Sequence, residues 1–356
     1  MRDKVFLMTG GGTGGHVIPA LAVARELRAR GHEVLFVGTS RGLEAKLAPA
    51  EGFHLEKIEI GGLKRVGARR MAATLLQLPI AAYHCDRFVR DAAAVFSMGG
   101  YVAGPPVLAA LLRRIPLVVM EPNAVPGLAN RIIAPFVSRA LVSFAAAASY
   151  FPSGRTEVTG LPVREEFFRI PAKPRTGALS ILITGGSQGS RTLNRASRQS
   201  WPMFRDAKFA ARITHQSGPG EFEELRGEFA QSGLAGEVVA FIQDMPAAFA
   251  QADLVVCRSG AGAVSELAAA GKASILTPFP FAADDHQTRN AEAMKQAGAA
   301  RLVPDSEMTG QRLFSTVSEL AAAPGAIERM AEAARSLAKP GAARRAAEIL
   351  EEVASA

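Results

Sequence analysis

The sequence predicts an α/β fold with two doubly wound domains, and three observations support this prediction. Short apolar runs ending in Gly, Pro or Ser alternate with helical patterns along the whole chain. A glycine-rich turn follows an apolar run near the start of each half. The chain has 356 residues, more than one hydrophobic core usually organises. Continuous apolar strands separated by helices indicate parallel sheets that are covered on both faces.

The short apolar runs are the predicted strands. In the first half they are Val5–Met8, Val34–Val37, Val95–Met98, Leu117–Met120 and Leu141–Phe144. In the second half they are Ser180–Thr184, Ala211–Thr214, Val238–Ile242, Leu254–Cys257 and Ala273–Thr277. A helix is expected to begin near Gly15, because apolar residues follow it at helical spacing.

A weak internal repeat sets the expected domain organisation. Gly10–Gly15 and Gly185–Ser190 each come directly after a predicted strand, so each opens a doubly wound domain. The segment 162–176 contains three prolines and predicts a linker. Pro340 and Gly341 interrupt a helical tail. The expected limits are residues 1–162 for the first domain, 163–340 for the second, and 341–356 for a last helix that returns to the first.

Composition and charge limit the possible partners. Hydrophobic residues make up 48% of the chain and charged residues 21%, which is typical of a globular protein. The formal net charge of +8 favours a polyanionic partner: a nucleic acid, an anionic lipid surface or a phosphorylated substrate. Cys85 and Cys257 have no second thiol or spaced histidine nearby, which argues against a zinc site or a disulfide framework and favours a reducing cytoplasm.

No segment predicts insertion into a membrane. The apolar run Val5–Met8 is too short for the core of a signal peptide. The longest apolar stretch, Met71–Tyr83, is interrupted by Gln77 and Pro79 and is shorter than the roughly 18 residues that a span needs. The chain is therefore expected not to cross a membrane.

The first glycine turn fits the pattern G-x-G-x-x-G through Gly10, Gly12 and Gly15, which lets backbone N–H groups approach a phosphate. A dinucleotide-binding fold also needs an acid at the end of its second strand for the ribose. That strand ends here in Gly38-Thr-Ser-Arg41, without an acid. Since Arg41 suits a 2′-phosphate, an NADP-dependent oxidoreductase stays an alternative.

Three further positions each have a structural and a functional interpretation. His16 follows the first glycine turn and is either a capping or core histidine or a proton acceptor. Glu266 lies within a small-residue segment after a predicted strand, as an ordinary first-turn acid or as a carboxylate for ribose hydroxyls. Asp284–Gln287 is either a solvated loop with a local cap or part of a ligand site.

Taken together and in order, seven segments match one family. They are Gly11–His16, Gly99–Tyr101, Glu121–Asn123, Gly185–Gly189, Phe241–Met245, Cys257–Gly260 and His286–Gln287. With them, the sequence closely resembles the bacterial N-acetylglucosaminyltransferases that convert lipid I to lipid II in peptidoglycan synthesis. The resemblance runs from the first predicted strand to the C-terminal helices, and the ordered set is highly specific.

The resemblance implies a GT-B fold, in which two Rossmann-like domains face each other across a cleft. The second domain would hold UDP-N-acetylglucosamine, with Ile242 at the uracil, Glu266 at the ribose and Gln287 at the sugar hydroxyls. The phosphate and nucleotide contacts that it implies are Ala261, Gly262, Ala263, Val264, Ser265, Ser187 and Arg164. The donor contacts that it implies in the first domain are Thr13, Gly14, Gly15 and Asn123. One position departs from the family motif, because Pro122 stands where Gln is expected.

The resemblance also implies an inverting reaction, in which the muramyl O4 hydroxyl attacks C1 of the α-linked donor and a β-1,4 bond forms. Such a displacement needs a base for the hydroxyl proton and a positive environment for the departing UDP. His16 is the expected base, and Glu121 is the rival base or the orienting group. No metal and no other cofactor is expected, because glycine turns and helix N-termini would hold the diphosphate and the chain has no D-x-D arrangement.

The expected partners are UDP-N-acetylglucosamine, lipid I, an anionic membrane surface and other cell-wall synthesis proteins, at the cytoplasmic face of the plasma membrane. The segment Lys64–Arg90 combines basic residues with Leu75, Leu76, Ile80 and Tyr83, and it predicts either the docking surface or a buried helix hairpin. A nucleic-acid-binding protein is the alternative from another class. It is disfavoured by an aromatic content of 6% and by the lack of a helix-turn-helix or zinc signature.

Overall fold

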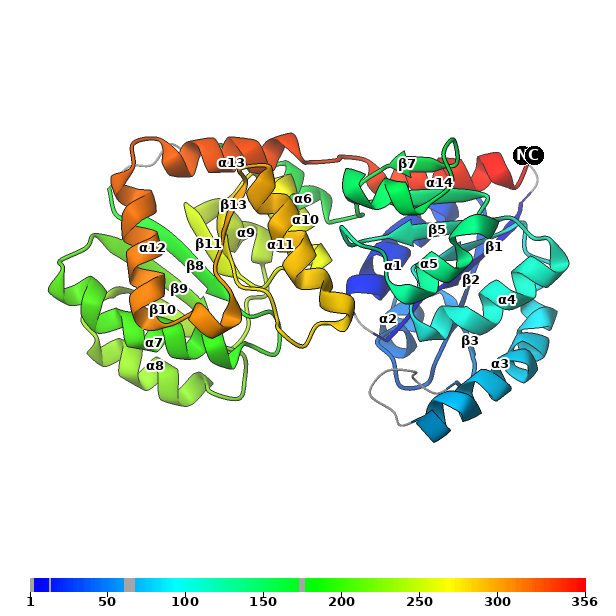
Figure 1. Ribbon diagram of the computed structural model, residues 1–356, viewed down its shortest axis with the longest axis horizontal. Helices are drawn as coiled ribbons and strands as arrows, with labels where there is room; N and C mark the ends of the chain where they lie inside the picture. The colour runs from blue at the N-terminus through cyan, green and yellow to red at the C-terminus, as the bar shows by residue number, and fades with distance from the viewer. Residues whose placement is uncertain (1–2, 13, 61–67, 173–176) are drawn as a thin grey trace. The chain divides into compact units, whose positions relative to one another are not determined.

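The computed structural model describes residues 3–12, 14–60, 68–172 and 177–356, with the side chains of 68–77 and of Ala283 outside the described set. The chain divides into two compact units (Figure 1). The N-terminal unit contains Met1–Val163 and Gly341–Ala356, and the C-terminal unit contains Arg164–Pro340.

The N-terminal unit is built on a parallel sheet, which has seven strands among the described residues, in the order β3-β2-β1-β4-β5-β6-β7. The strands are β1 (Val5–Thr9), β2 (Glu33–Gly38), β3 (His54–Lys57), β4 (Ala94–Ser97), β5 (Leu117–Glu121), β6 (Arg139–Val142) and β7 (Thr156–Val158). Strands β4 and β5 are buried along their whole length, which explains why they read as continuous apolar runs.

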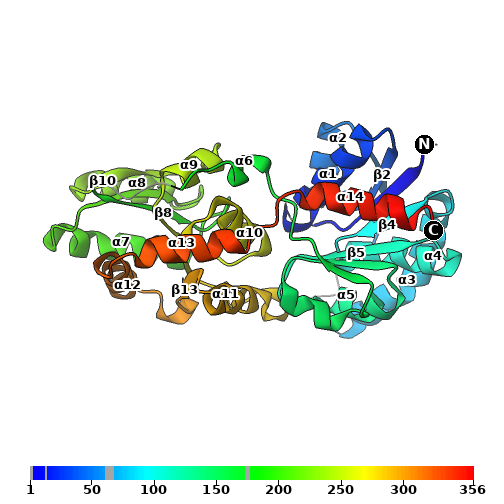
Figure 2. The same ribbon diagram turned by 90° about the horizontal axis from the view of Figure 1, so that it is seen from above.

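Helices cover both faces of this sheet. They are α1 (Gly14–Ala29), α2 (Glu44–Ala50), α3 (Ala68–Val89), α4 (Gly104–Arg113), α5 (Leu128–Ile133) and α14 (Ala342–Val353), with 3-10 helices at Tyr101–Ala103, Ala134–Phe136 and Ala145–Tyr150. Within this unit, α1, α2 and α14 lie on one side of the sheet and α3, α4 and α5 on the other (Figure 2). On the second side, Cys85 and Val89 of α3 and Val107 of α4 pack against Leu7 and Val95 of the sheet.

Helix α14 belongs to the N-terminal unit although it ends the chain. It contacts α1, and its Ile349 and Leu350 are fully buried. The carboxylate of Glu351 accepts a hydrogen bond from Arg30 at 3.0 Å. Arg345 binds both carboxylate oxygens of Glu157 in β7, at 2.8 and 3.0 Å. Apolar burial and two ion-paired positions therefore fix the end of the chain to this sheet.

The C-terminal unit has a parallel sheet of six strands among its described residues, in the order β10-β9-β8-β11-β12-β13. The strands are β8 (Leu179–Thr184), β9 (Ala211–Gln216), β10 (Ala235–Val239), β11 (Leu254–Cys257), β12 (Ala273–Leu276) and β13 (Ala300–Leu302). The helices are α6 (Glu165–Phe168), α7 (Arg191–Asp206), α8 (Phe222–Gln231), α9 (Met245–Gln251), α10 (Ala261–Ala270), α11 (His286–Gln296), α12 (Gly310–Ala322) and α13 (Ala326–Ser336). Trp201 and Phe204 of α7 pack with Leu313 and Val317 of α12 in the core.

The predicted strands all correspond to observed ones, but two have shifted bounds and three edge strands were missed. β6 and β10 both begin and end earlier than the predicted runs Leu141–Phe144 and Val238–Ile242. Strands β3, β7 and β13 were missed; β3 and β7 are the two edges of the first sheet, and β13 is one edge of the second. Edge strands face solvent on one side, so they are short and lack the continuous apolar run of a buried strand.

Part of the predicted linker is a folded element of the C-terminal unit. Helix α6 contacts α9 and α10, and its Phe167 is fully buried. The guanidinium of Arg335 donates to the carbonyl oxygens of Phe168 at 3.4 Å and of Ile170 at 2.7 Å. The chain therefore folds into the second unit directly after Val163.

Both sheets have the doubly wound strand order, which confirms the predicted fold class. The order reverses between β1 and β4 in the first sheet and between β8 and β11 in the second. Ligands of such sheets bind outside the carboxyl ends of the strands at this point. The two glycine turns follow β1 and β8, so each lies at the switch point of its own sheet. No helix in the described parts of the chain is long and apolar enough to cross a membrane.

Candidate active site

His16 lies in the first turn of α1, beside the glycine turn that follows β1. Its Nδ1 is 3.4 Å from the carbonyl oxygen of Gly11. Its ring also lies against Gly100, because a Cβ on that glycine would stand 3.5 Å from two ring atoms. In the tautomer that donates from Nδ1 to Gly11, Nε2 carries a lone pair and can accept a proton. Gly14 and Gly15 open the same helix, and Thr13 lies outside the described residues.

Glu121 is the last residue of β5, and Asn123 belongs to the loop that follows it. Oε1 of Glu121 accepts hydrogen bonds from the backbone N–H of Asn123 at 2.9 Å and from its side-chain amide at 3.0 Å. Oε2 accepts from the N–H of Gly127 at 3.2 Å and from the amide of Asn130 at 2.8 Å. Burial raises the pKa of Glu121, and these hydrogen bonds only partly offset that rise. The carboxylate therefore organises its own loop and holds Asn123 within it.

A second buried carboxylate, missed in the sequence, lies under the first glycine turn. Glu44 is 2% exposed, and its Oε2 accepts a hydrogen bond from the N–H of Gly12 at 2.8 Å. A dinucleotide-binding fold would have its ribose-binding acid at the end of β2, where this chain has none. The acid comes one short turn later in the chain, and it binds the glycine turn itself instead of facing a ribose.

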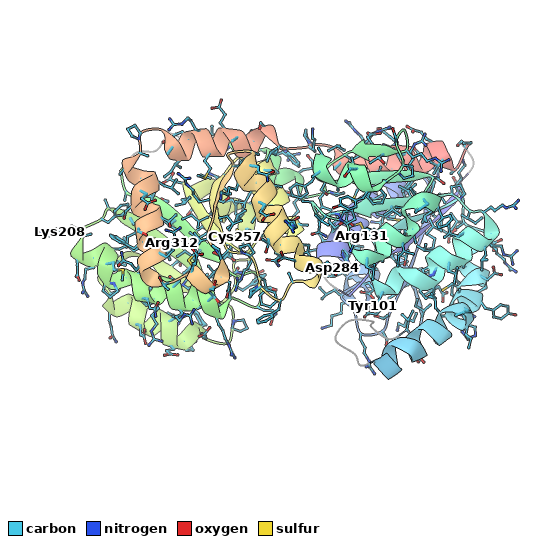
Figure 3. All side chains as sticks on the ribbon, in the orientation of Figure 1. Tyr101, Arg131, Lys208, Cys257, Asp284 and Arg312 are labelled. Carbon is cyan, nitrogen blue, oxygen red and sulfur yellow. The ribbon has the colours of Figure 1, made fainter. Side chains whose placement is uncertain are left out.

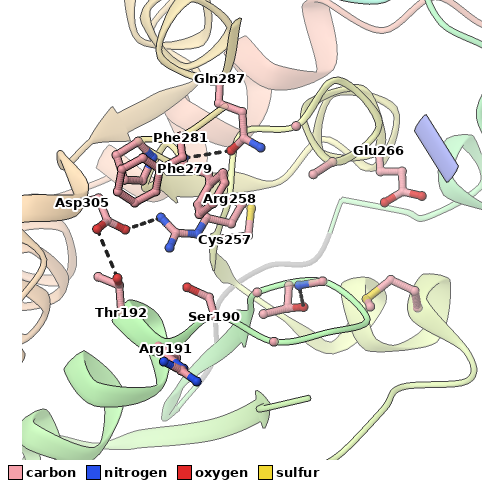
Figure 4. Close-up of a pocket in the computed structure, with 18 of the residues that line it drawn as sticks. Ser190, Arg191, Thr192, Cys257, Arg258, Glu266, Phe279, Phe281, Gln287 and Asp305 are labelled. Carbon is pink, nitrogen blue, oxygen red and sulfur yellow. Dashed lines mark hydrogen bonds and ion pairs between the residues drawn. The ribbon is translucent and has the colours of Figure 1, made fainter. Parts of the chain in front are cut away.

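The C-terminal unit contains a pocket of about 650 Å³ at its switch point (Figure 4). Its walls come from the glycine turn after β8, from the segment after β11 with the start of α10, and from the segments that follow β12 and β13. The residues that line it include Gly185, Gly186, Gly189, Ser190, Thr192, Cys257, Arg258, Ala263, Glu266, Phe279, Gln287 and Asp305. A cavity of this size suits a nucleotide sugar.

Glu266 is the acidic residue on the α10 side of the pocket. Burial raises the pKa of its carboxyl to about 7, although the positive charge of Arg164 acts in the opposite direction. Arg164 Nη2 lies 4.0 Å from Glu266 Oε1. A carboxyl with this pKa changes charge near neutral pH, so its capacity to accept hydrogen bonds from hydroxyl groups depends on pH.

Gln287 enters the pocket from the start of α11, and Figure 4 shows its contact with Phe279. Its Oε1 accepts a hydrogen bond from the N–H of Phe279 at 3.0 Å, which leaves the Nε2 amide as a donor on the pocket side. The hydroxyl of Ser259 donates to the carbonyl oxygen of Gln287 at 2.8 Å, and Asn290 donates to that of Ser259 at 3.1 Å. These bonds fix the start of α11 to the segment after β11.

Gln216, also missed in the sequence, connects the second glycine turn to Ile242. It is 1% exposed at the end of β9. Its amide Nε2 donates to Thr184 Oγ1 at 3.1 Å and to the carbonyl oxygen of Gly186 at 2.8 Å. Its Oε1 accepts from the N–H of Ile242 at 2.8 Å. One buried side chain thus sets the distance between the turn and the Ile242 backbone.

The pocket joins some of the expected donor residues and not others. Ala263, Glu266 and Gln287 line it. The remaining ones do not line it: Arg164, Ser187, Ile242, Ala261, Gly262, Val264 and Ser265. Ser187 is exposed on the glycine turn, whereas Val264 is 1% exposed, so its side chain belongs to the core. A contact of Val264 with a ligand would have to come from its backbone.

Two further features of the pocket were not predicted. Arg258 donates to Asp305 at 2.5 Å, and Thr192 donates to the same carboxylate at 3.2 Å (Figure 4). Cys257, labelled in Figure 3, is 3% exposed at the end of β11. Burial, with a smaller effect from the charge of Glu266, raises the pKa of its thiol to about 12. The thiol therefore stays protonated, which excludes it as a nucleophile at neutral pH.

Two family models match the chain. The N-terminal domain of glycosyltransferase family 28 matches residues 6–142, and the C-terminal domain of the same family matches residues 180–349. The UDP-N-acetylglucosamine–N-acetylmuramyl-(pentapeptide) pyrophosphoryl-undecaprenol N-acetylglucosamine transferase of Solibacter usitatus is 70% identical over 349 residues, covering 98% of this chain and 96% of that protein. The transferase of the same name from Nitrosococcus oceani is 42% identical and covers 100% of both chains. The crystal structure of Acinetobacter baumannii MurG has a TM-score of 0.84 at 32% identity and covers 98% of this chain and 99% of that one.

Two Rossmann-like domains and a pocket of nucleotide-sugar size define a glycosyltransferase of the GT-B fold. The chain belongs to glycosyltransferase family 28. It is a UDP-N-acetylglucosamine-dependent N-acetylglucosaminyltransferase, as the resemblance implied. The oxidoreductase and nucleic-acid-binding alternatives have no support from these relatives.

Proposed function

We propose that the chain transfers N-acetylglucosamine from UDP-N-acetylglucosamine to N-acetylmuramyl-(pentapeptide) pyrophosphoryl-undecaprenol, which is lipid I, and so forms lipid II. The observation that carries this function is the 70% identity across 98% of the chain to a transferase named for this donor and acceptor. The C-terminal pocket supports it, because a glycine turn, a carboxylate and a side-chain amide line one cavity.

The donor binds in the C-terminal unit in this proposal. The ribose hydroxyls donate to the Glu266 carboxylate, and the sugar hydroxyls accept from the Gln287 amide. The glycine turn at 185–189 and the start of α10 receive the diphosphate, because backbone N–H groups and the positive end of a helix favour an anion. The uracil meets the backbone at Ile242, which Gln216 holds at a fixed distance from the turn.

The reaction is a single displacement at C1 of the sugar. The acceptor O4 forms the new bond to C1 while the bond from C1 to the β-phosphate oxygen breaks, and UDP leaves with the electron pair. Nε2 of His16 takes the proton of the attacking hydroxyl. Glu121 is better suited to hold Asn123 than to act as the base, because both of its oxygens already accept hydrogen bonds from its own loop.

A transfer assay with labelled UDP-N-acetylglucosamine and a short-chain lipid I analogue tests this function. We expect labelled disaccharide product and a rate that survives EDTA. Loss of the rate with EDTA and its recovery with magnesium would contradict the metal-free mechanism. Calorimetric titration with the donor, NADPH and an oligonucleotide separates the three functional classes, and we expect heat of binding only from the donor.

We also propose that the face formed by α3 and α4 docks on an anionic membrane surface. These helices contact each other, and Arg113 of α4 binds both oxygens of Asp86 in α3 at 2.6 Å. Large apolar side chains stand exposed beside this pair: Ile80 at 61%, Tyr83 at 78% and Leu112 at 75%. Arg87, Arg90 and Arg114 are exposed on the same two helices or at their ends. Apolar side chains that enter the headgroup region and arginines that meet anionic lipid are the features of an interfacial site.

Vesicle co-sedimentation tests the docking surface. We expect binding that requires anionic phospholipid, weakens with salt, and falls in Ile80→Ser and Tyr83→Ser. Phe241→Ser is the matched control, because Phe241 is 51% exposed in the other unit. Equal binding to neutral vesicles, or an equal loss in the control, would contradict the proposal. Leu75 and Leu76 lie on α3, but their side chains are outside the described residues.

A further inference from the structure

A buried carboxylate binds the backbone of the first glycine turn. Glu44 is the first residue of α2 and is almost fully buried. Its Oε2 accepts from the N–H of Gly12 at 2.8 Å. Its Oε1 accepts from the N–H of Thr39 at 2.9 Å and from the Thr39 hydroxyl at 3.0 Å. One side chain therefore joins the turn after β1, the end of β2 and the start of α2.

Three glycines form the walls around this carboxylate. A Cβ added to Gly11, Gly38 or Gly42 would overlap the Glu44 side chain. The N–H of Gly42 also donates to the Thr39 hydroxyl at 3.2 Å, which orients that hydroxyl toward Glu44. The glycines at these three positions are therefore explained by the space that Glu44 needs, without a ligand.

The carboxylate is charged in this position. Burial alone would raise its pKa, but the hydrogen bonds from the backbone N–H groups of Gly12, Thr39 and Glu44 and from the Thr39 hydroxyl together outweigh burial, and the pKa of Glu44 is lowered. An ionised acceptor makes short, strong hydrogen bonds to backbone N–H groups. The turn is thus held by a charge-assisted bond.

The bond from Gly12 bears directly on His16. The N–H of Gly12 and the carbonyl of Gly11 belong to one planar peptide group, so fixing the N–H fixes the direction of the C=O. Glu44 binds the N–H end of this group at 2.8 Å, and Nδ1 of His16 lies 3.4 Å from its carbonyl oxygen. A single rigid peptide unit therefore lies between the carboxylate and the imidazole.

We infer that Glu44 is a positioning residue that sets the orientation of His16 through the Gly11–Gly12 peptide group. The inference rests on the proposed function, in which His16 accepts the proton of the acceptor hydroxyl. With the peptide fixed, Gly11 keeps Nδ1 as the hydrogen-bond donor and Nε2 as the proton acceptor. Without Glu44, the peptide group can rotate, and the Gly11 carbonyl no longer fixes the orientation of the imidazole.

The test compares Glu44→Ala and Glu44→Gln with Glu51→Gln, a control that removes a carboxylate at the end of the same helix. The Glu51 carboxylate instead binds Arg25 at 2.7 Å near the surface. We expect kcat to fall by about ten- to a hundredfold in Glu44→Ala, because small misplacement of a reacting group has effects of this size. Glu44→Gln keeps the shape of the side chain, but its amide has one acceptor oxygen and can accept from Gly12 or from Thr39, not from both. Its kcat should therefore fall less than that of Glu44→Ala. The calorimetric Kd of UDP should stay within about twofold, because UDP binds in the other unit in the proposed function.

A double-mutant cycle with His16→Ala separates positioning from a general structural role. If Glu44 acts through His16, the double variant has the kcat of His16→Ala alone. Multiplied losses, an unchanged kcat in both Glu44 variants, or a loss of UDP affinity equal to the loss of kcat would overturn the inference. If the wild-type chain transfers nothing, the proposed function fails instead. Hydrogen exchange of the Gly12 amide then tests the Glu44 contact independently of activity. The exchange rate should rise in Glu44→Ala and stay unchanged in Glu51→Gln.

Discussion

The glycine turn after β1 and the glycine turn after β8 occupy equivalent places in their sheets, yet they present different surfaces. In the first turn, the N–H of Gly12 binds the carboxylate of Glu44 inside the protein. The second turn lines a pocket of about 650 Å³. The buried side chain of Gln216 donates a hydrogen bond to the carbonyl oxygen of Gly186 in this turn. The first turn binds a side chain of its own unit, and the second turn lines a cavity.

The difference shows what a glycine-rich turn does and does not specify. Glycines after a strand allow the backbone to approach an acceptor closely, but the acceptor can be a phosphate or a carboxylate of the same chain. In the first unit that carboxylate comes from α2, and His16 lies next to the turn, in the first turn of α1. In the second unit Glu266 and Gln287 line the pocket with the turn. This contrast supports the proposal that the first turn serves the chemistry and the second binds the donor.

The largest expected effect is on the first turn. His16→Ala should lower the rate of the chemical step by about two to four decades, the usual range for loss of a general base. The affinity for UDP should hardly change, because the UDP pocket lies in the other unit. Rapid-quench kinetics and UDP calorimetry measure the two quantities separately. If the variant loses donor binding and keeps its turnover, His16 is a binding residue. Both turns would then serve binding.

The second effect concerns the support of the second turn. Gln216→Leu removes the acceptor of the Ile242 N–H and the donor to Gly186, and each buried polar group left unpaired costs about 1–3 kcal/mol. We expect the UDP affinity to fall by roughly ten- to a hundredfold. Gln199→Leu is a matched control, because Gln199 accepts from the N–H of Gly310 at 3.2 Å and does not line the pocket. Wild-type UDP affinity in Gln216→Leu would show that the turn holds its shape without this contact.

Local sequence was enough to predict the parts of the fold that are buried from both sides. Strands such as β4 and β11 lie in the middle of their sheets, so their apolar runs are continuous and unambiguous. β3 reads His-Leu-Glu-Lys at the edge of its sheet and is half exposed, which leaves no comparable pattern. Propensity cannot identify such a strand, because the neighbouring strand supplies most of its stabilisation.

The sequence named candidate site residues where they follow a strand end or belong to the ordered family motif. His16, Glu266 and Gln287 were proposed on these grounds, and Glu266 and Gln287 line one pocket. Glu44 and Gln216 were missed, because each acts on a turn that is distant in the sequence and close only in the folded sheet. The paired glycines on either side of Thr39 were the available signal for Glu44, but they become meaningful only once β1 and β2 are known to pair.

The third effect depends on the charge of Glu266 in the pocket beside the second turn. Its pKa is raised to about 7, so lowering the pH through 7 protonates it and removes the carboxylate that the ribose hydroxyls need. We expect the Kd of UDP-N-acetylglucosamine to be about tenfold higher at pH 6 than at pH 8, where most of the population is ionised. The donor suits this measurement, since its diphosphate diester does not titrate in this range.

Glu266→Gln is the control for that pH dependence, because glutamine has the same shape without the titrating group. The variant should bind the donor more weakly at pH 8 and show a nearly flat pH profile. UDP should weaken together with the complete donor, because both contain the ribose. A wild-type Kd that rises from pH 6 to pH 8, or a profile that survives in Glu266→Gln, would place the titrating group elsewhere.

The smallest expected effect divides the open pocket into a nucleotide part and a sugar part. Gln287 uses its Oε1 for the N–H of Phe279, so only its Nε2 amide can reach the sugar hydroxyls. Gln287→Ala removes that donor, and the loss of one such hydrogen bond is worth about 0.5–1.5 kcal/mol. We expect the donor KM to rise by about three- to tenfold while the inhibition constant of UDP stays the same, because UDP has no sugar hydroxyls beyond its ribose. Gln287→Met keeps the length of the side chain and should behave like the alanine variant, which excludes a simple loss of packing. Equal changes in the donor KM and in the inhibition constant of UDP would place Gln287 in the nucleotide part. The pocket would then have no residue assigned to the sugar hydroxyls.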